Sequence, residues 1–189
     1  MTWERDQVEN LFGEAKDRIN NGVSRDLMCR LEDELPPSET RHLTDTRTRV
    51  STLLEYALGY EANDILRKNS NRQWLSCVLW NVFPDLLLRN AEGFVEAGIE
   101  VKALHTAAEE KSANLSTPLS KIRAIGDYLV IMNWGWEASS KFGSDVRYPH
   151  VYSVEVFDAH LLARIRDYTW LKNQGGRSKG IDCSTPIIS

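Results

Sequence analysis

The chain has 189 residues, of which 42% are hydrophobic and 26% are charged, and its formal net charge is -4 at pH 7. These values are ordinary for a folded globular domain, so they exclude a disordered or fibrous chain and fit one compact domain. The acidic balance argues against indiscriminate nucleic-acid binding, although it is compatible with a locally basic groove.

The three cysteines, Cys29, Cys77 and Cys183, are odd in number and widely spaced. This pattern favours reduced thiols in a cytoplasmic protein over a disulfide framework. The first residues are charged and lack the apolar stretch of a signal peptide, and no window approaches the roughly 20 apolar residues of a membrane helix. We therefore expect a cytoplasmic protein that does not bind membranes.

Two helices are predicted at the start of the chain. Apolar residues recur at helical spacing over residues 8–19 and stop at the polar residues 20–22. A second helix is expected over residues 24–35, with Ser24 as its N-cap, because the two prolines that follow forbid its continuation. Together these helices would form a hairpin in a helical N-terminal extension over residues 1–43.

A third helix and a β-hairpin are predicted next. An apolar helical face runs through residues 44–66. Residues 74–80 are rich in aromatic and β-favouring types and begin the strands. Residues 83–89 form a second predicted strand, and residues 94–104 a third, joined by a tight turn at residues 90–93.

The hairpin is followed by a predicted crossover. Residues 106–113 have a helix-forming composition, and Pro118 interrupts before a short segment over residues 119–125. Residues 127–134 are almost continuously apolar, as in a central strand that is covered on both faces. A helical crossover into such a strand favours parallel pairing.

The last predicted elements are a strand over residues 151–157 and a helix capped by Asp158. A flexible basic tail follows over residues 175–180. The order of elements predicts an α/β domain over residues 44–189, in one compact unit with the extension. The inner face of the last helix is expected to carry Leu161, Leu162, Ile165 and Tyr168.

Two acids and a lysine suggest phosphodiester chemistry. Hydrolysis of a phosphodiester needs an activated water and a neutralised negative charge, and metal ions held by carboxylates supply both. A nearby lysine can stabilise the developing charge or help to activate the water. Glu100 and Lys102 share one face of the third strand, because side chains alternate, whereas Val101 points to the other face.

The hairpin turn decides where Asp85 lies relative to these residues. If the turn centres on residues 92–93, Asp85 lies opposite Glu100, with the two Cβ atoms about 4.5–5.5 Å apart. That separation allows both carboxylates to bind one ion. A turn at residues 91–92 would instead place Asp85 opposite Gly98, on the same face but diagonal to Glu100.

The Glu-x-Lys pattern is weak by itself, because the chain contains it at residues 14–16, 100–102 and 109–111. The first and third copies lie in helical segments, where residues two apart diverge and cannot converge on one ion. Only the copy at residues 100–102 has apolar residues at the alternate positions, as in a half-buried strand. The competing interpretation of the cluster is an exposed cross-strand ion group with a structural role.

The residues Phe83-Pro84-Asp85 followed by Ile99-Glu100-Val101-Lys102 resemble the motif of the PD-(D/E)XK nuclease superfamily, particularly that of type II restriction endonucleases. The similarity covers about residues 44–136. It implies a restriction-endonuclease-like mixed β-sheet flanked by helices and cleavage of double-stranded DNA. It also implies that Asp85 and Glu100 bind Mg²⁺, for which Mn²⁺ may substitute, and that Lys102 is the catalytic lysine.

Many members of this superfamily add an acid from the helix before the sheet. Here that helix contains Glu55 and Glu61. Glu55 is more similar to the family position but lies at the edge of the apolar face. Glu61 is nearer the centre of that face, where an unpaired carboxylate is costly unless a metal or another partner meets it. Glu55 is the favoured candidate.

A homodimer is the natural expectation for such an enzyme, because two sites related by a two-fold axis suit a palindromic target. Two alternatives stay open. A repair or junction-resolving nuclease would share the same three catalytic residues. A non-catalytic DNA- or protein-binding module would use the acidic cluster only structurally.

Other candidate residues carry weaker signals. The four histidines, His42, His105, His150 and His160, lack zinc-ligand spacing. Four aromatic residues can stack on bases, but such residues are more often part of a core: Trp134, Trp136, Tyr148 and Tyr152. Five basic residues are candidates for a DNA groove, although most are expected to be solvated charges: Lys111, Lys121, Arg123, Lys141 and Arg147.

Overall fold

The computed structural model describes residues 3–30, 40–69, 72–78, 82–107 and 115–173. The helices are α1 (Arg5–Asn21), α2 (Val23–Asp26), α3 (Thr40–Lys68) and α4 (Ala159–Asn173), with a 3₁₀ turn η2 (Leu119–Lys121). The strands are β1 (Cys29–Arg30), β2 (Trp74–Cys77), β3 (Leu86–Arg89), β4 (Val95–His105), β5 (Asp127–Ser139) and β6 (Gly143–Asp158). Among these described residues, no helix is both long and apolar enough to cross a membrane.

The six strands form one mixed sheet in the order β1-β6-β5-β4-β3-β2. Only β4 and β5 pair in parallel, and the other neighbours are antiparallel. The expected α/β class and the expected parallel strand over residues 127–134 are therefore confirmed. The crossover between β4 and β5 is described only in part, as a turn at residues 106–107 and the 3₁₀ turn η2; residues 108–114 lie outside the described part.

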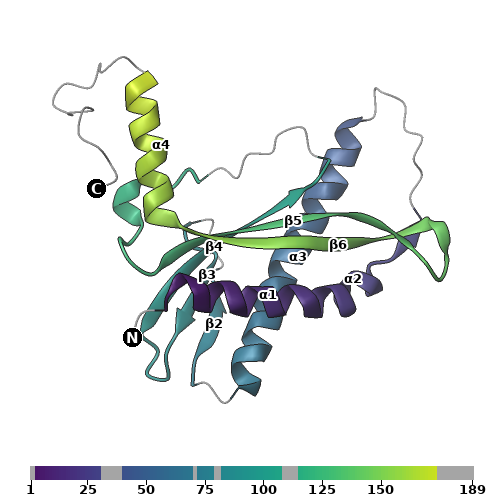
Figure 1. Cartoon of the computed structure of the whole chain (residues 1–189), viewed down its shortest axis with the longest axis horizontal. Coiled ribbons are helices and arrows are strands. Elements are labelled where there is room, and N and C mark those ends of the chain that lie inside the picture. Colours follow the sequence, from purple (N-terminus) through teal and green to yellow (C-terminus); the bar gives the residue numbers. More distant parts are fainter. Residues whose placement is uncertain (1–2, 31–39, 70–71, 79–81, 108–114, 174–189) are drawn as a thin grey trace.

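The main core lies between one face of the sheet and two helices. Figure 1 shows α1 running below β5 and β6, with α3 crossing behind it, and α4 standing on the other side of the sheet. The apolar stripe of α1 is buried as its spacing predicts: Val8, Leu11, Phe12, Ala15 and Ile19. It belongs to the same buried cluster as residues of α3 and of the central strands, among them Leu54, Leu58, Ile99, Val101, Val130 and Met132.

The helix predicted over residues 24–35 is wrong. The helix α2 ends at Asp26, and Cys29 and Arg30 pair with Arg147 and Val146 at the edge of β6. An open strand edge offers backbone partners that outweigh a weak helix propensity. Ser24 lies inside α2, whose N-cap is Gly22. Residues 31–39, with the rest of the predicted helix, lie outside the described part.

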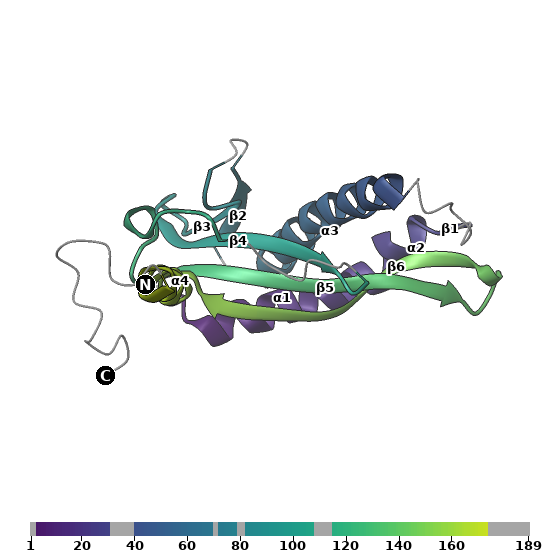
Figure 2. The same ribbon diagram turned by 90° about the horizontal axis from the view of Figure 1, so that it is seen from above.

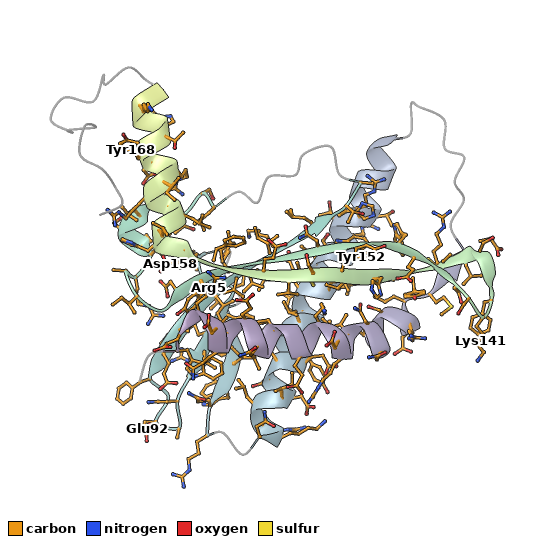
Figure 3. All side chains as sticks on the ribbon, viewed as in Figure 1. Arg5, Glu92, Lys141, Tyr152, Asp158 and Tyr168 are labelled. Carbon is orange, nitrogen blue, oxygen red and sulfur yellow. The ribbon has the colours of Figure 1, made fainter. Side chains whose placement is uncertain are left out.

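The strands β5 and β6 are much longer than the sequence predicts. They have 13 and 16 residues and form a hairpin arm that projects beyond the rest of the sheet, with Lys141 at its tip (Figures 1 and 3). The Ser139 hydroxyl accepts the amides of Lys141 and Phe142, and Gly143 takes a φ of 102°, which closes the turn. Trp134 and Trp136 consequently lie within a strand, not at its end.

The last helix is capped as predicted, since the Leu161 amide donates to Asp158 Oδ1 over 2.6 Å. The expected inner face is wrong in part, because Leu161 and Ile165 are 41% and 40% exposed. The buried positions are Ala159 and Ala163, with Leu162 packed beside them. The alanines of α4 therefore face η2 and β5, and the larger side chains of Leu161 and Ile165 lie on the exposed side of the helix.

Candidate active site

The β3–β4 hairpin has the register that sets Asp85 beside Glu100. Leu86 pairs with Ile99 and Leu87 with Gly98, which is the register predicted to place Asp85 opposite Glu100. The turn itself lies at residues 91–92, not at 92–93, and a β-bulge between Leu88 and Arg89 shifts the pairing by one residue into this register. Two interactions specify this turn. The Asn90 side chain accepts the amides of Glu92 and Phe94, and Gly93 has a φ of 86°. Asp85 lies immediately before β3. If the same pairing were extended by one residue, Asp85 would lie opposite Glu100.

Two carboxylates lie along an open edge of β4. Because β3 begins at Leu86, no strand of the described residues pairs on that side with the amides of β4 beyond Ile99. The Val101 amide donates to Asp85 Oδ2 over 2.9 Å, and the Ala103 amide donates to Glu55 Oε1 over 2.9 Å. Glu55 thus reaches the edge from α3.

The other predicted helix acid behaves differently. Glu61 lies six residues further along α3 and is absent from the interactions of the cluster, in which Glu55 accepts the Ala103 amide and is influenced by the charges of Lys102, Asp85 and Glu100. Of the two candidates left open by the sequence, the structure therefore brings Glu55 to the cluster.

Glu100 and Lys102 lie on the sheet face opposite the main core. Their neighbour Val101 is buried in that core, so alternation turns both side chains the other way. Lys102 Nζ lies 2.6 Å from Glu100 Oε1. Glu100 is only 9% exposed, and its buried Oε2 has no hydrogen-bond partner among the described residues.

Burial and mutual charge change the titration of this cluster. Burial raises the pKa of Glu100; the hydrogen bond from Lys102 opposes this change and the nearby Asp85 carboxylate reinforces it. Burial also raises the pKa of Glu55, against the Ala103 amide and the Lys102 charge. Burial alone would lower the pKa of Lys102, but Glu100, Asp85 and Glu55 outweigh it and raise this pKa. Lys102 is therefore a cation at neutral pH.

Gly98 is a positioning residue that the sequence did not single out. A Cβ at this position would lie 2.5 Å from Asp127 Oδ1 and 3.0 Å from Pro84 Cγ. The Asp127 carboxylate is itself held by the Gly98 amide and by the backbone and side chain of Arg123. Glycine therefore allows Pro84, and with it Asp85, to approach β4. A glycine inside a predicted strand was the available signal.

A pocket of about 140 Å³ opens beside the acids. Glu55 and Asp85 are its charged lining residues, and the others are Thr52, Tyr56, Cys77, Val78, Leu86 and Val101. The volume suits several water molecules and not a nucleotide. Cys77 is an exposed free thiol, as is Cys29. Cys183 lies outside the described residues.

The histidines and basic residues do not extend the site into a metal cluster. Within residues 3–30, 40–69, 72–78, 82–107 and 115–173, no three His, Cys, Asp or Glu side chains converge as a ready-made metal centre. His105 is buried with its Nδ1 accepting the Ala107 amide, and burial lowers its pKa. Arg123 pairs with Asp127, and Lys141 is at the far tip of the β5–β6 arm (Figure 3). Lys111 lies outside the described residues.

Comparison of the sequence with protein-family models and with curated proteins finds no match. The resemblance to PD-(D/E)XK nucleases therefore rests on the motif residues and on the order of the elements around them.

Proposed function

We propose that this protein is a metal-dependent endonuclease that hydrolyses phosphodiester bonds in double-stranded DNA, as type II restriction endonucleases do. The observation that carries the proposal is the buried Oε2 of Glu100, which has no hydrogen-bond partner among the described residues although Asp85 and Lys102 lie beside it. A buried carboxylate oxygen without a donor is costly. A bound cation relieves that cost, which favours a metal ligand over a surface ion group.

Asp85 and Glu100 would hold the metal, with Mg²⁺ as the expected ion and Mn²⁺ as a substitute. A donor set of two acids fits Mg²⁺, because this ion commonly takes one or two carboxylates and completes its octahedron with water and substrate phosphates. When bound, the ion supplies an activated water and positive charge at the phosphate. Glu55 lies on the same strand edge outside this donor set, and its raised pKa suits a group that exchanges a proton with water.

Lys102 would stabilise the charge that develops on the attacked phosphate. Its raised pKa keeps the ammonium protonated at neutral pH, which suits electrostatic stabilisation better than proton abstraction. The contact with Glu100 holds the ammonium at the site before substrate arrives. Preorganised charge of this kind needs no rearrangement during the reaction.

A structural role is the competing explanation. Asp85 and Glu55 accept the amides of Val101 and Ala103, so both acids contribute to the fold by satisfying an open strand edge. In a non-catalytic binding module these contacts would be the whole purpose of the cluster. The orphaned Glu100 oxygen is the feature that this explanation leaves unexplained.

The direct test is DNA cleavage. Plasmid and phage DNA are incubated with the protein and Mg²⁺, or with a chelator, beside Asp85→Ala and Lys102→Ala. We expect cleavage only with the metal, and a loss of roughly 100-fold or more in each variant. Glu61→Gln and Lys141→Ala, which change charges outside the cluster, should cut like the wild type. Intact DNA in every reaction, or equal cutting by Asp85→Ala, would refute the assigned site.

Metal binding gives a second readout that does not depend on the DNA sequence. An ion at ten times its dissociation constant adds about 1.4 kcal/mol to the free energy of unfolding. Mn²⁺ or Ca²⁺ should therefore raise the melting temperature of the wild type and of Glu61→Gln, but not that of Asp85→Ala. An equal rise in all three would place the ion elsewhere.

The proposed restriction activity also carries the expectation of a homodimer, since cleavage of both strands at a palindrome requires two related sites. Light scattering with and without DNA tests this part separately. A protein that cuts both strands as a monomer would retain the assigned chemistry and lose the restriction-type assembly.

A further inference from the structure

The sheet face of Glu100 and Lys102 continues across β5 and β6. Lys102 is beside Ile131 of β5, which pairs with Glu155 of β6. Residues opposed across strands share a face, so this face passes from β4 to the β5–β6 arm. Figure 2 looks onto it: α4 is seen end-on at one end, α1 lies beneath the strands, and no described helix covers the outer half of the arm.

A β-bulge keeps a row of aromatic residues on this same face. Asn133 pairs with Ser153 and Trp134 with Val151, so Tyr152 is the extra residue. Val151 is buried in the main core, and Ser153 Oγ accepts from Asn133 on the outer face. Because of the bulge, the successive residues Tyr152 and Ser153 both face outward. Positions 148, 150 and 152 on one side of the bulge therefore lie on the same face of β6 as positions 153 and 155 on the other side. Bulges commonly re-aim side chains near functional sites.

A glycine makes room for the exposed tyrosine. A Cβ at Gly135 would lie 2.7 Å from Thr106 Oγ1 and 3.1 Å from Tyr152 Cε2. The ring of Tyr152 therefore extends across the backbone of β5 at Gly135, and a side chain at position 135 would displace the ring. Tyr152 is 49% exposed. A bulge and a glycine at adjacent positions both serve to present this ring.

The rings of Tyr148, His150 and Tyr152 form a continuous series, here called the aromatic row. Their centroids are 6.3 Å and 5.1 Å apart in edge-to-face contacts. The Arg25 guanidinium lies 5.9 Å from the centroid of the Tyr148 ring at one end of the row, and the Glu137 carboxylate lies 3.3 Å from His150 Nδ1 in its middle. By contrast, Trp134 is fully buried and donates to Ser51, as expected of a core residue.

We propose that the aromatic row stacks on unpaired bases of the DNA substrate, an inference that rests on the proposed nuclease function. Tyr152 is the exposed ring of the row, whereas Tyr148 and His150 are half-buried. An exposed aromatic ring on a sheet face stacks on the flat surface of a base, and a duplex hides that surface in its own stack. From strand spacing and residue rise, Tyr152 lies about 14 Å from Lys102 along the sheet. That distance corresponds to at most about four nucleotides from the attacked phosphate, the number reached at the 3.4 Å spacing of stacked nucleotides. The substrate class is thus duplex DNA with a single-stranded tail, flap or junction beside the cut. This inference keeps the proposed metal-dependent cleavage of DNA and replaces the palindromic duplex target of a restriction enzyme with the target of a repair or junction nuclease.

The test measures binding without cleavage. Fluorescence anisotropy in a chelator compares a blunt duplex with the same duplex carrying a single-stranded tail. The wild type should bind the tailed duplex more tightly, and Tyr152→Leu should weaken that binding roughly 5- to 150-fold. Tyr152→Phe should retain it, because the ring remains. The matched control is Tyr60→Leu, which removes a tyrosine that is 71% exposed on α3 and should bind like the wild type.

Several outcomes would overturn the inference. These are equal affinity for blunt and tailed DNA, unchanged binding by Tyr152→Leu, or an equal loss in Tyr60→Leu. If Tyr152→Leu does not fold, 2-aminopurine in the tail gives the answer with the wild type: stacking quenches its fluorescence, and an unchanged signal refutes the row as a binding surface. Because no cleavage is needed, a protein that binds tails through Tyr152 but never cuts DNA would refute the proposed function and not this surface.

Discussion

The two hairpins of the sheet differ in how their sequences specify them. The β3–β4 hairpin is short, and local chemistry fixes it: Asn90 and Gly93 close its turn, and apolar residues alternate along β4. The β5–β6 hairpin is long, and its outer half carries polar and aromatic residues with a bulge at Tyr152. Ser139 and Gly143 close its turn locally as well, but the strands also contact α1 and β1, which are remote in sequence. Contacts between residues close in sequence can be predicted from the sequence pattern, whereas contacts between residues far apart in sequence cannot.

Alanine substitutions of the strand glycines Gly98 and Gly135 should show that the short β3–β4 hairpin is packed more rigidly than the long β5–β6 hairpin. Gly98→Ala is expected to destabilise the protein by about 2 kcal/mol, because the new methyl group meets the rigid Pro84 ring and a carboxylate fixed by Arg123. Urea unfolding measures the change. Gly13→Ala is the control: its Cβ meets nothing within 4 Å, and alanine in a helix should stabilise by up to about 1 kcal/mol. A neutral Gly98→Ala would contradict the tight approach of Pro84 to β4.

The matching change in the long hairpin should cost less. Gly135→Ala meets the Tyr152 ring and the Thr106 hydroxyl, both of which belong to exposed side chains with room on the solvent side. We expect a loss below about 1 kcal/mol, accompanied by weaker binding of tailed DNA as the ring moves. If Gly135→Ala is as damaging as Gly98→Ala, the arm is packed as rigidly as the short hairpin and the contrast between them is wrong.

The smallest expected effect concerns the charge of Glu55 and its dependence on pH. The pKa of Glu55 is raised in the folded protein, so its charged form lowers the free energy of unfolding. This loss of stability is absent below the ordinary pKa of 4.5 and develops as the pH rises through the pKa of the folded protein. Glu55→Gln retains an acceptor for the Ala103 amide without this charge. The variant should therefore be more stable than the wild type at pH 7, with a difference that disappears as the pH falls below 4.5.

Thermal unfolding over a series of pH values measures this difference. Glu61→Gln is the matched control for the loss of one negative charge from α3. A Glu55→Gln protein that is less stable than the wild type at pH 7, or a difference that does not vary with pH, would show that burial does not disfavour the Glu55 carboxylate.

The sequence was sufficient for the motif hairpin and insufficient for what surrounds it. Alternation and turn chemistry predicted that Asp85 and Glu100 share a face, and the register of Leu86 with Ile99 agrees, although it depends on a β-bulge at Leu88 and Arg89 that was not predicted. The choice between Glu55 and Glu61 depends on where α3 crosses the open edge of β4, which helical periodicity does not encode. The same limit explains α2, since the pairing of Cys29 with Arg147 spans most of the chain.

Residues at the end of the chain show a related limit. Leu161 and Ile165 follow the expected apolar spacing, yet the buried side of α4 is the one with alanines. Periodicity identifies a helix and its apolar positions, but the position of α4 against the sheet decides which of them are covered.

The carboxylates on the open edge of β4 also have a consequence for solubility. An unpaired strand edge is a template on which another chain can add a strand, and proteins commonly protect such edges with charge. Asp85 and Glu55 occupy the Val101 and Ala103 amides that an added strand would need. Any variant that removes these acids therefore exposes an adhesive edge, and loss of activity in such variants has to be separated from self-association.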